Sequence, residues 1–182
     1  GDGVKGTDNA DRVGPQRAIQ SGVITPQAMK KAIIITSLLT LLSAIILIYF
    51  AFGESNFGYS IFFLLLGIAA IVSAIRYTVG NSAYGYKGFG DVFVFIFFGL
   101  VSTLGVNFLY SKEVDPLLIL PAISIGLLSV GVLNLNNMRD IESDRLSGKN
   151  SLALRMGFKN AMIYEMILLQ FHDRVQKVQN FQ

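Results

Sequence analysis

Two groups of acidic residues, each mixed with basic residues, could carry chemistry in this sequence. On a helix, Asp140 and Asp144 would lie four residues apart and share a face, with Asn137 nearly on it. Like charges at this spacing repel unless a cation lies between them, and Mg²⁺ is a hard cation that binds carboxylates and substrate phosphates. The second group therefore indicates a magnesium site. The first group lies more than a hundred residues earlier and comprises Asp2, Asp8 and Asp11 with Lys5, Arg12 and Arg17.

A solvated loop with local ion pairs is the alternative reading of the second group. Asp140 could simply pair with Arg139 or Arg145, and for this group in isolation that reading is the better one. Two observations favour the metal site. Asn134 and its polar neighbours run into the end of an apolar segment, where they are costly unless they face a cavity. Both groups also mix carboxylates with Arg or Lys, which suits a diphosphate held by metals and neutralised by basic side chains.

A third candidate region is the glycine-rich stretch at residues 76–91. Tyrosine near a membrane interface is often only an aromatic belt residue, and this reading has about equal weight for Tyr84 and Tyr86. Tyr77 and Lys87 are better candidates, because both should lie at the mouth beside the acidic groups. Asp91 closes the stretch.

Four long segments without any charged residue must position these loops. They are residues 32–52, 57–75, 92–111 and 116–138, each close to the ~20 residues that cross a bilayer as a helix. The whole chain of 182 residues is 52% hydrophobic and only 15% charged. We therefore expect an all-α, multi-span transmembrane helix bundle. Glycines inside these segments, at 99, 105, 126 and 131, predict close helix packing.

The basic residues are distributed unevenly between the loops. Residues 1–31, 76–91 and 139–160 hold five, two and five Lys or Arg, whereas 53–56 and 112–115 hold none and one. Since basic residues near helix ends stay cytoplasmic, the three basic loops should share the cytoplasmic side. This bias explains the basic composition, so we expect membrane lipid around the chain and no nucleic-acid partner.

The end of the chain departs from this pattern. Residues 161–171 are mostly apolar with Glu165 inside, and residues 172–182 are polar. About eleven apolar residues are too few to span a bilayer. The stretch is either an interfacial amphipathic helix or the end of a sequence that is cut short or altered. We therefore expect a transmembrane domain over residues 1–171, incomplete at both ends, followed by a polar tail over 172–182.

The motifs in these loops resemble those of the UbiA superfamily of membrane prenyltransferases. Within it they are most similar to the 1,4-dihydroxy-2-naphthoate polyprenyltransferases of menaquinone synthesis. The usual Asn-Asp a few residues before Asp2 and the helix preceding it are absent, and four spans stand where the family has about nine. The matching strings are GDGVKGTDNADRVGP at 1–15, YTVG at 77–80, YGYKGFGD at 84–91, NNMRDIESDR at 136–145, GKN at 148–150 and LRMG at 154–157.

The resemblance implies a Mg²⁺-dependent transferase that moves a polyprenyl group from an allylic polyprenyl diphosphate to an aromatic acceptor. In menaquinone biosynthesis that acceptor is 1,4-dihydroxy-2-naphthoate, and the expected location is the bacterial inner membrane. The residues implied as catalytic and as metal ligands are Asp2, Asp8, Asp140 and Asp144, and the ring of Tyr77 would face the prenyl cation. The candidates for diphosphate binding are Arg12, Lys87, Arg139, Arg145 and Lys149.

Three other readings stay open. Another UbiA-type enzyme could use a haem, chlorophyll or hydroxybenzoate acceptor, although these fit residues 77–91 less well. Membrane CDP-alcohol phosphotransferases also bind diphosphates through Asp and metal, but they use one compact motif, whereas these acidic groups lie far apart. A transporter fragment should carry charges within its spans, and the four apolar segments carry none.

Overall fold

The computed structural model describes residues 2–5 and 15–179, and every regular element in these residues is a helix. The all-α prediction is therefore confirmed. The α-helices are α1 (Asp2–Lys5), α2 (Pro26–Phe52), α3 (Phe57–Arg76), α4 (Gly90–Val94), α5 (Ser102–Ser111), α6 (Ile119–Arg139), α7 (Ile141–Leu146), α8 (Leu152–Met156) and α9 (Phe158–Gln179). A π-helical segment, Phe95–Val101, joins α4 to α5, and 3₁₀ turns form at Tyr84–Lys87 and Pro116–Leu118.

Four helical segments are long and apolar enough to cross a membrane: Pro26–Phe52, Phe57–Arg76, Gly90–Ser111 and Pro116–Arg139. Local sequence sets the ends of the first one. The Thr25 hydroxyl accepts a hydrogen bond from the Ala28 amide at 3.1 Å, and Pro26 occupies the first turn, where its missing amide hydrogen is not needed. Gly53, with φ of 57°, ends the helix in a conformation that favours glycine. The multi-span prediction is thus confirmed in number and position.

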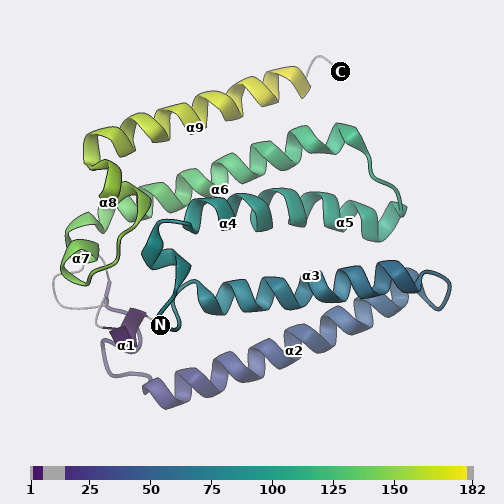
Figure 1. Cartoon of the computed structure of the whole chain (residues 1–182), viewed down its shortest axis with the longest axis horizontal. Helices are drawn as coiled ribbons and strands as arrows, with labels where there is room; N and C mark the ends of the chain where they lie inside the picture. Colours follow the sequence, from purple (N-terminus) through teal and green to yellow (C-terminus); the bar gives the residue numbers. More distant parts are fainter. Residues whose placement is uncertain (1, 6–14, 180–182) are drawn as a thin grey trace.

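The spans run alternately up and down, so their connections gather at two ends of the bundle. Figure 1 shows α1, α7, α8 and the loop between α3 and α4 at one end. The connections from α2 to α3 and from α5 to α6 lie at the opposite end. The grouping of the basic loops that the charge pattern predicts is therefore observed. We call the end that carries them the basic end.

Glycines allow α6 to approach its neighbours closely, as the sequence predicts. A Cβ atom on Gly99 would lie 2.7 Å from both the Ala122 carbonyl oxygen and the Gly126 Cα, so nothing larger than hydrogen fits between these spans. On the other side of α6, a Cβ on Gly131 would lie 2.9 Å from the Glu165 carboxylate of α9. Gly105 is different, because its nearest neighbour, Phe63, would lie at an ordinary 3.8 Å.

Helix α9 runs beside α6 along its length instead of lying across the bundle end (Figure 1). Polar pairs join the two helices. The Asn134 amide donates to the Ala161 carbonyl at 3.0 Å and to Glu165 Oε2 at 2.9 Å. Nearer the other end, Ser124 Oγ lies 2.7 Å from His172 Nδ1. The polar residues of α9 thus find partners on α6, and the interfacial position of this helix stays a prediction. Residues 172–179 continue this helix.

Candidate active site

Tyr77 follows the last residue of α3, and the loop after it folds around its side chain. Its carbonyl oxygen accepts a hydrogen bond from the Gly85 amide at 3.0 Å. A Cβ on Gly85 would lie only 2.6 Å from that oxygen, and a Cβ on Gly90 would lie 3.2 Å from the tyrosine ring. These two glycines thus let the backbone close on both sides of Tyr77. This packing fixes the position of the ring at the basic end.

Carboxylates from distant parts of the chain act on the Tyr77 hydroxyl. Burial, and then the negative charges of Asp2 and Asp91, raise the pKa of Tyr77 to about 12, with smaller contributions from Tyr84 and Asp144. These carboxylates therefore lie within electrostatic range of this hydroxyl. Asp2 and Asp144 therefore come together at the basic end, although 142 positions separate them in the sequence. Tyr77 stays protonated at neutral pH.

Asp144 is fully buried and only half paired. Its Oδ1 lies 3.2 Å from the ammonium of Lys149, whereas Oδ2 has no hydrogen-bond partner. Burial raises the pKa of Asp144, while Lys149 and the nearby Ser151 hydroxyl lower it in part. Ser151 Oγ itself is buried and lacks a partner with hydrogen-bonding geometry. An unpaired buried carboxylate oxygen is costly, so this atom is suited to accept a cation or a donor from a ligand.

Asp140 lies at the break between α6 and α7. Its carbonyl accepts a hydrogen bond from the Asp144 amide at 2.8 Å, so the two acidic residues lie one helical turn apart. Its carboxylate forms two hydrogen bonds with Arg139, at 2.8 and 2.9 Å. The local ion pair considered from sequence is therefore present at Asp140. Asp144 pairs with Lys149 instead.

Three loops are tied together at this end by direct hydrogen bonds. The Tyr86 hydroxyl donates to Asp2 Oδ1 at 2.7 Å, and the Tyr86 carbonyl accepts from the Asn150 amide at 3.2 Å. The Arg155 guanidinium donates to the Lys87 carbonyl at 2.8 Å. The loop at 77–89 thus bridges the segment that carries Asp2 and the segment that carries Asp144. From sequence alone an aromatic-belt role has about equal weight for Tyr86, whereas in the structure its hydroxyl holds the Asp2 carboxylate in place.

The predicted basic residues separate into two sets. Lys149 and Arg139 contact the carboxylates directly, as described above. Lys87 directs its ammonium to Ser82 Oγ at 2.7 Å, and Arg145 forms an exposed pair with Glu142 at 3.5 Å. Neither of these two contacts involves a carboxylate of the predicted metal group. Asp8 and Arg12 lie outside the described residues.

The profile of the UbiA prenyltransferase family matches residues 4–171. The chain belongs to this family. It is 50% identical over 169 residues to 1,4-dihydroxy-2-naphthoate octaprenyltransferase of Escherichia coli (strain K12), which covers 93% of this chain and 54% of that relative. It is 36% identical over 168 residues to the enzyme of the same name from Mycobacterium tuberculosis, with coverages of 92% and 54%.

More distant relatives match a shorter stretch. UbiA prenyltransferase domain-containing protein 1 of Mus musculus is 35% identical over 96 residues, which is 51% of this chain and 27% of that protein. No solved structure matched the chain. The chain spans about half the length of the curated relatives it matches most fully. The predicted resemblance to the UbiA family is confirmed.

The described carboxylates of this UbiA family chain do not form a complete metal site by themselves. Residues 2–5 and 15–179 contain no group of three or more His, Cys, Asp or Glu side chains close enough to hold a metal ion. Asp2, Asp140 and Asp144 therefore do not form such a group, and Asp8 lies outside the described residues. Mg²⁺ commonly binds through one or two carboxylates, with phosphate oxygens and water completing its shell. Asp144, whose Oδ2 has no hydrogen-bond partner, is suited to supply one such carboxylate.

Sequence reasoning missed two partners that only tertiary structure reveals. Tyr164 on α9 donates a hydrogen bond to Asp91 Oδ2 at 3.1 Å, and Asp91 is 7% exposed. Ser151 lies beside Asp144, as described above. Tyr164 stands in an apolar stretch that carries no local sign of a functional role. Its neighbour Glu165 was the only visible signal that this stretch faces polar groups.

Proposed function

We propose that this chain, as part of a complete enzyme, transfers a polyprenyl group from an allylic polyprenyl diphosphate to 1,4-dihydroxy-2-naphthoate in menaquinone biosynthesis. The observation that carries the proposal is that Tyr86 joins the two acidic segments. Its hydroxyl donates a hydrogen bond to Asp2, and its carbonyl accepts one from Asn150, next to the Lys149 that pairs with Asp144. The names of the relatives that match almost the whole chain support the acceptor. The basic end would face the cytoplasm of a bacterium, in accordance with its excess of Lys and Arg.

The carboxylates would hold Mg²⁺ together with the diphosphate. The ligands would be Asp2 and Asp8 from the first motif and Asp140 and Asp144 from the second. When bound, the ion would stabilise the negative charge that develops on the departing diphosphate. Lys149, already beside Asp144, would neutralise a further oxygen. Arg139 is positioned to do the same from the end of α6, and Arg12, Lys87 and Arg145 remain candidates.

The ring of Tyr77 would stabilise the prenyl cation that forms when the diphosphate departs. Its pKa of about 12 keeps the phenol neutral, so the ring presents its π face without a competing phenolate. An aromatic face stabilises a nearby cation by about 0.5–2 kcal/mol. Packing against Gly85 and Gly90 holds the ring in this position. Asp2 is oriented at the same place by the Tyr86 hydroxyl.

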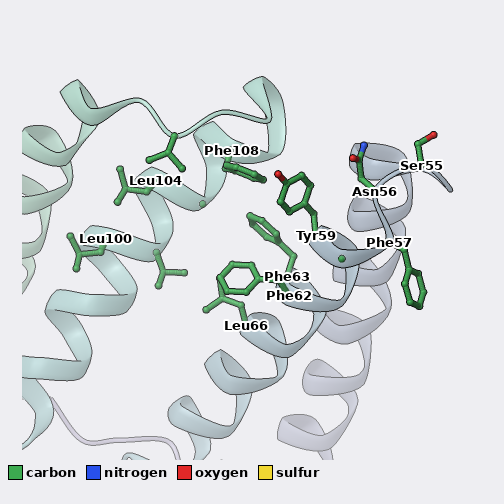
Figure 2. A pocket seen from close by; sticks show the side chains of 14 residues that line it. Ser55, Asn56, Phe57, Tyr59, Phe62, Phe63, Leu66, Leu100, Leu104 and Phe108 are labelled. Carbon is green, nitrogen blue, oxygen red and sulfur yellow. The ribbon is translucent and has the colours of Figure 1, made fainter.

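An apolar cavity toward the opposite end of the bundle suits the far part of a long isoprenoid tail. It has a volume of about 1060 Å³ and lies between α3 and residues 100–108, and Ser55, Asn56 and Val114 from the loops at that end belong to its lining. Figure 2 shows Phe62, Phe63, Leu66 and Phe108 among the side chains that line it. Leu66, the lining residue of α3 nearest to Tyr77, precedes it by about three turns, so the tail would have to extend about 16 Å along the bundle before it reaches the cavity. A long apolar tail would gain free energy by entering it.

Prenyl transfer by membranes that contain the full-length protein tests the proposal. We expect radiolabelled polyprenyl diphosphate and 1,4-dihydroxy-2-naphthoate to give a prenylated product with Mg²⁺ and none after chelation. Replacing the acceptor with 4-hydroxybenzoate should abolish the product. Transfer that persists without any divalent cation would contradict the metal role. Equal transfer to 4-hydroxybenzoate would contradict the assignment of 1,4-dihydroxy-2-naphthoate as the acceptor. The chain would then belong to an enzyme with a different UbiA-type activity.

The pH dependence of Mg²⁺ binding should depend on Ser151. Because burial raises the pKa of Asp144, this carboxyl takes up a proton at a higher pH than the ~3.9 of an ordinary Asp, and the neutral form binds cations poorly. The apparent Mg²⁺ affinity should therefore fall as the pH falls through the raised value. Since Ser151 lowers this pKa, Ser151→Ala should raise the pH at which the Mg²⁺ affinity begins to fall, which we call the acid limb of the affinity curve. Isothermal titration with Mg²⁺ and diphosphate across a pH series would measure it.

Ser147→Ala is the matched control for this series. The Ser147 hydroxyl donates to the Asp144 backbone carbonyl at 3.1 Å and does not contact the carboxylate. Its removal should leave the acid limb in place. Equal movement of the limb in both variants would show that the Ser151 hydroxyl does not act on Asp144.

A further inference from the structure

A second apolar groove lies at the basic end, beside the first turns of α2. It has a volume of about 510 Å³ and lies between α1, the first turns of α2, and the end of α3 with the residues after it. Figure 1 shows α1 near the beginning of α2 at this end of the bundle. Aliphatic side chains form much of its lining, with Ile33 and Ile34 from α2, and Ile75 and Val79 from α3 and beyond. Nothing in the proposed transfer reaction uses it.

The polar part of the groove carries only positive charge. Lys5 and Lys30 line it, and none of the described residues that line it is acidic. Lys5 is held in place, because its ammonium donates to the Gly80 carbonyl at 2.9 Å and lies 4.0 Å from the centre of the Tyr86 ring. Lys30 is exposed, one residue before the equally exposed Lys31. Two cations thus stand at the edge of an apolar surface.

We propose that this groove binds an anionic phospholipid of the surrounding bilayer. The phosphate would lie between Lys5 and Lys30, and the upper part of an acyl chain would cover Ile33 and Ile34. The depth is suitable, because these residues belong to the first turns of the span, where headgroups meet hydrocarbon. From Pro26 to Ile34 the groove extends only about 12 Å along α2, which is too short for a transmembrane helix. Its charge selects an anionic headgroup over a zwitterionic one.

Bound lipid would also hold the helix that carries the first carboxylate. Helix α1 has only four residues, among them Asp2, Val4 and Lys5. Val4 and Lys5 line the groove, whereas Asp2 is bound by Tyr86. A lipid that contacts Val4 and Lys5 would therefore limit the movement of Asp2. The lipid site and the proposed transfer site would share one short helix.

Lipid retention by the purified chain tests this inference independently of prenyl transfer. The chain is reconstituted in nanodiscs that contain equal amounts of phosphatidylglycerol and phosphatidylcholine, and retained lipid is counted by native mass spectrometry. We expect preferential retention of phosphatidylglycerol. Lys30→Ala should weaken it by about fivefold or more, which is the factor that one interfacial basic residue supplies. Lys31→Ala, the matched control outside the groove, should weaken it less.

A second pair of variants tests the apolar floor. Ile33→Trp should fill the groove and reduce phosphatidylglycerol retention, whereas Ile35→Trp, which is not part of the lining, should not. Equal losses in the two lysine variants would show only general attraction of the basic end to an anionic surface and would overturn the proposal. Equal retention of phosphatidylcholine, or full displacement by glycerol phosphate, would overturn it too, since the site would then lack headgroup selectivity or bind a free phosphate.

Discussion

Asp144→Asn in the full-length protein should lower the rate of prenyl transfer by about a hundredfold or more. The substitution keeps the size of the side chain but removes the charge that the proposed metal–diphosphate complex needs. It leaves the four spans unchanged, so the protein should still insert into the membrane. The radiolabelled-transfer assay measures the rate, and the yield of membrane-extracted protein measures insertion. Asp140→Ala should act in the same direction.

A second measurement separates loss of the metal site from loss of structure. Mg²⁺ with inorganic diphosphate should raise the thermal unfolding temperature of the wild-type protein and leave that of Asp144→Asn unchanged, because only a ligand that binds the folded state stabilises it. Glu142→Gln is the matched control, since Glu142 lies on the same helix in an exposed pair with Arg145. It should retain both activity and the response to Mg²⁺. Full activity in Asp144→Asn would exclude the second motif as the metal site.

Gly99→Val should destabilise the bundle by about 1–3 kcal/mol or prevent its assembly. The first added carbon alone would lie 2.7 Å from the Ala122 carbonyl oxygen and from the Gly126 Cα, which are backbone atoms that cannot rotate away. The two spans would have to separate, and α6 carries Asp140 at its end. Unfolding in mixed detergent and SDS micelles would measure the free energy of unfolding.

Gly105→Val provides the control within the same span. A Cβ at this position would lie 3.8 Å from the Phe63 ring, which is an ordinary contact. It should therefore change the free energy of unfolding by less than about 1 kcal/mol. If Gly99→Val and Gly105→Val unfold alike, the close approach of the two spans at Gly99 does not contribute to stability.

The local sequence was sufficient to predict the spans and the end at which their basic loops meet. Inside a bilayer every backbone amide and carbonyl must be bonded within the segment, so a charge-free run of about 20 residues can only be a helix. The alternation of the four segments then brings residues 139–151 to the end that carries Asp2 and Tyr77. The candidate site residues were also visible, because the charged residues are excluded from the four apolar segments and gather in the loops.

The partners of those groups were decided by packing. Asp144 pairs with Lys149, which lies in the turn after α7, and both side chains are buried. The α9 segment looked too polar to join the bundle, yet Asn134 and Glu165 satisfy each other across the helix interface. Neither choice can be read from one segment alone, because each depends on which residues of another segment lie opposite.

The sequence alone thus determined the number of spans, their alternation and the chemical character of the loops, since these follow from the local free energy of transfer into lipid. The tertiary structure decided that the carboxylates of Asp2, Asp91 and Asp144 lie within electrostatic range of Tyr77. That arrangement depends on distances between helices, and these distances are set by contacts such as Gly99 against Gly126. A change of one ångström in such a contact moves a side chain at the end of a span without altering any local pattern.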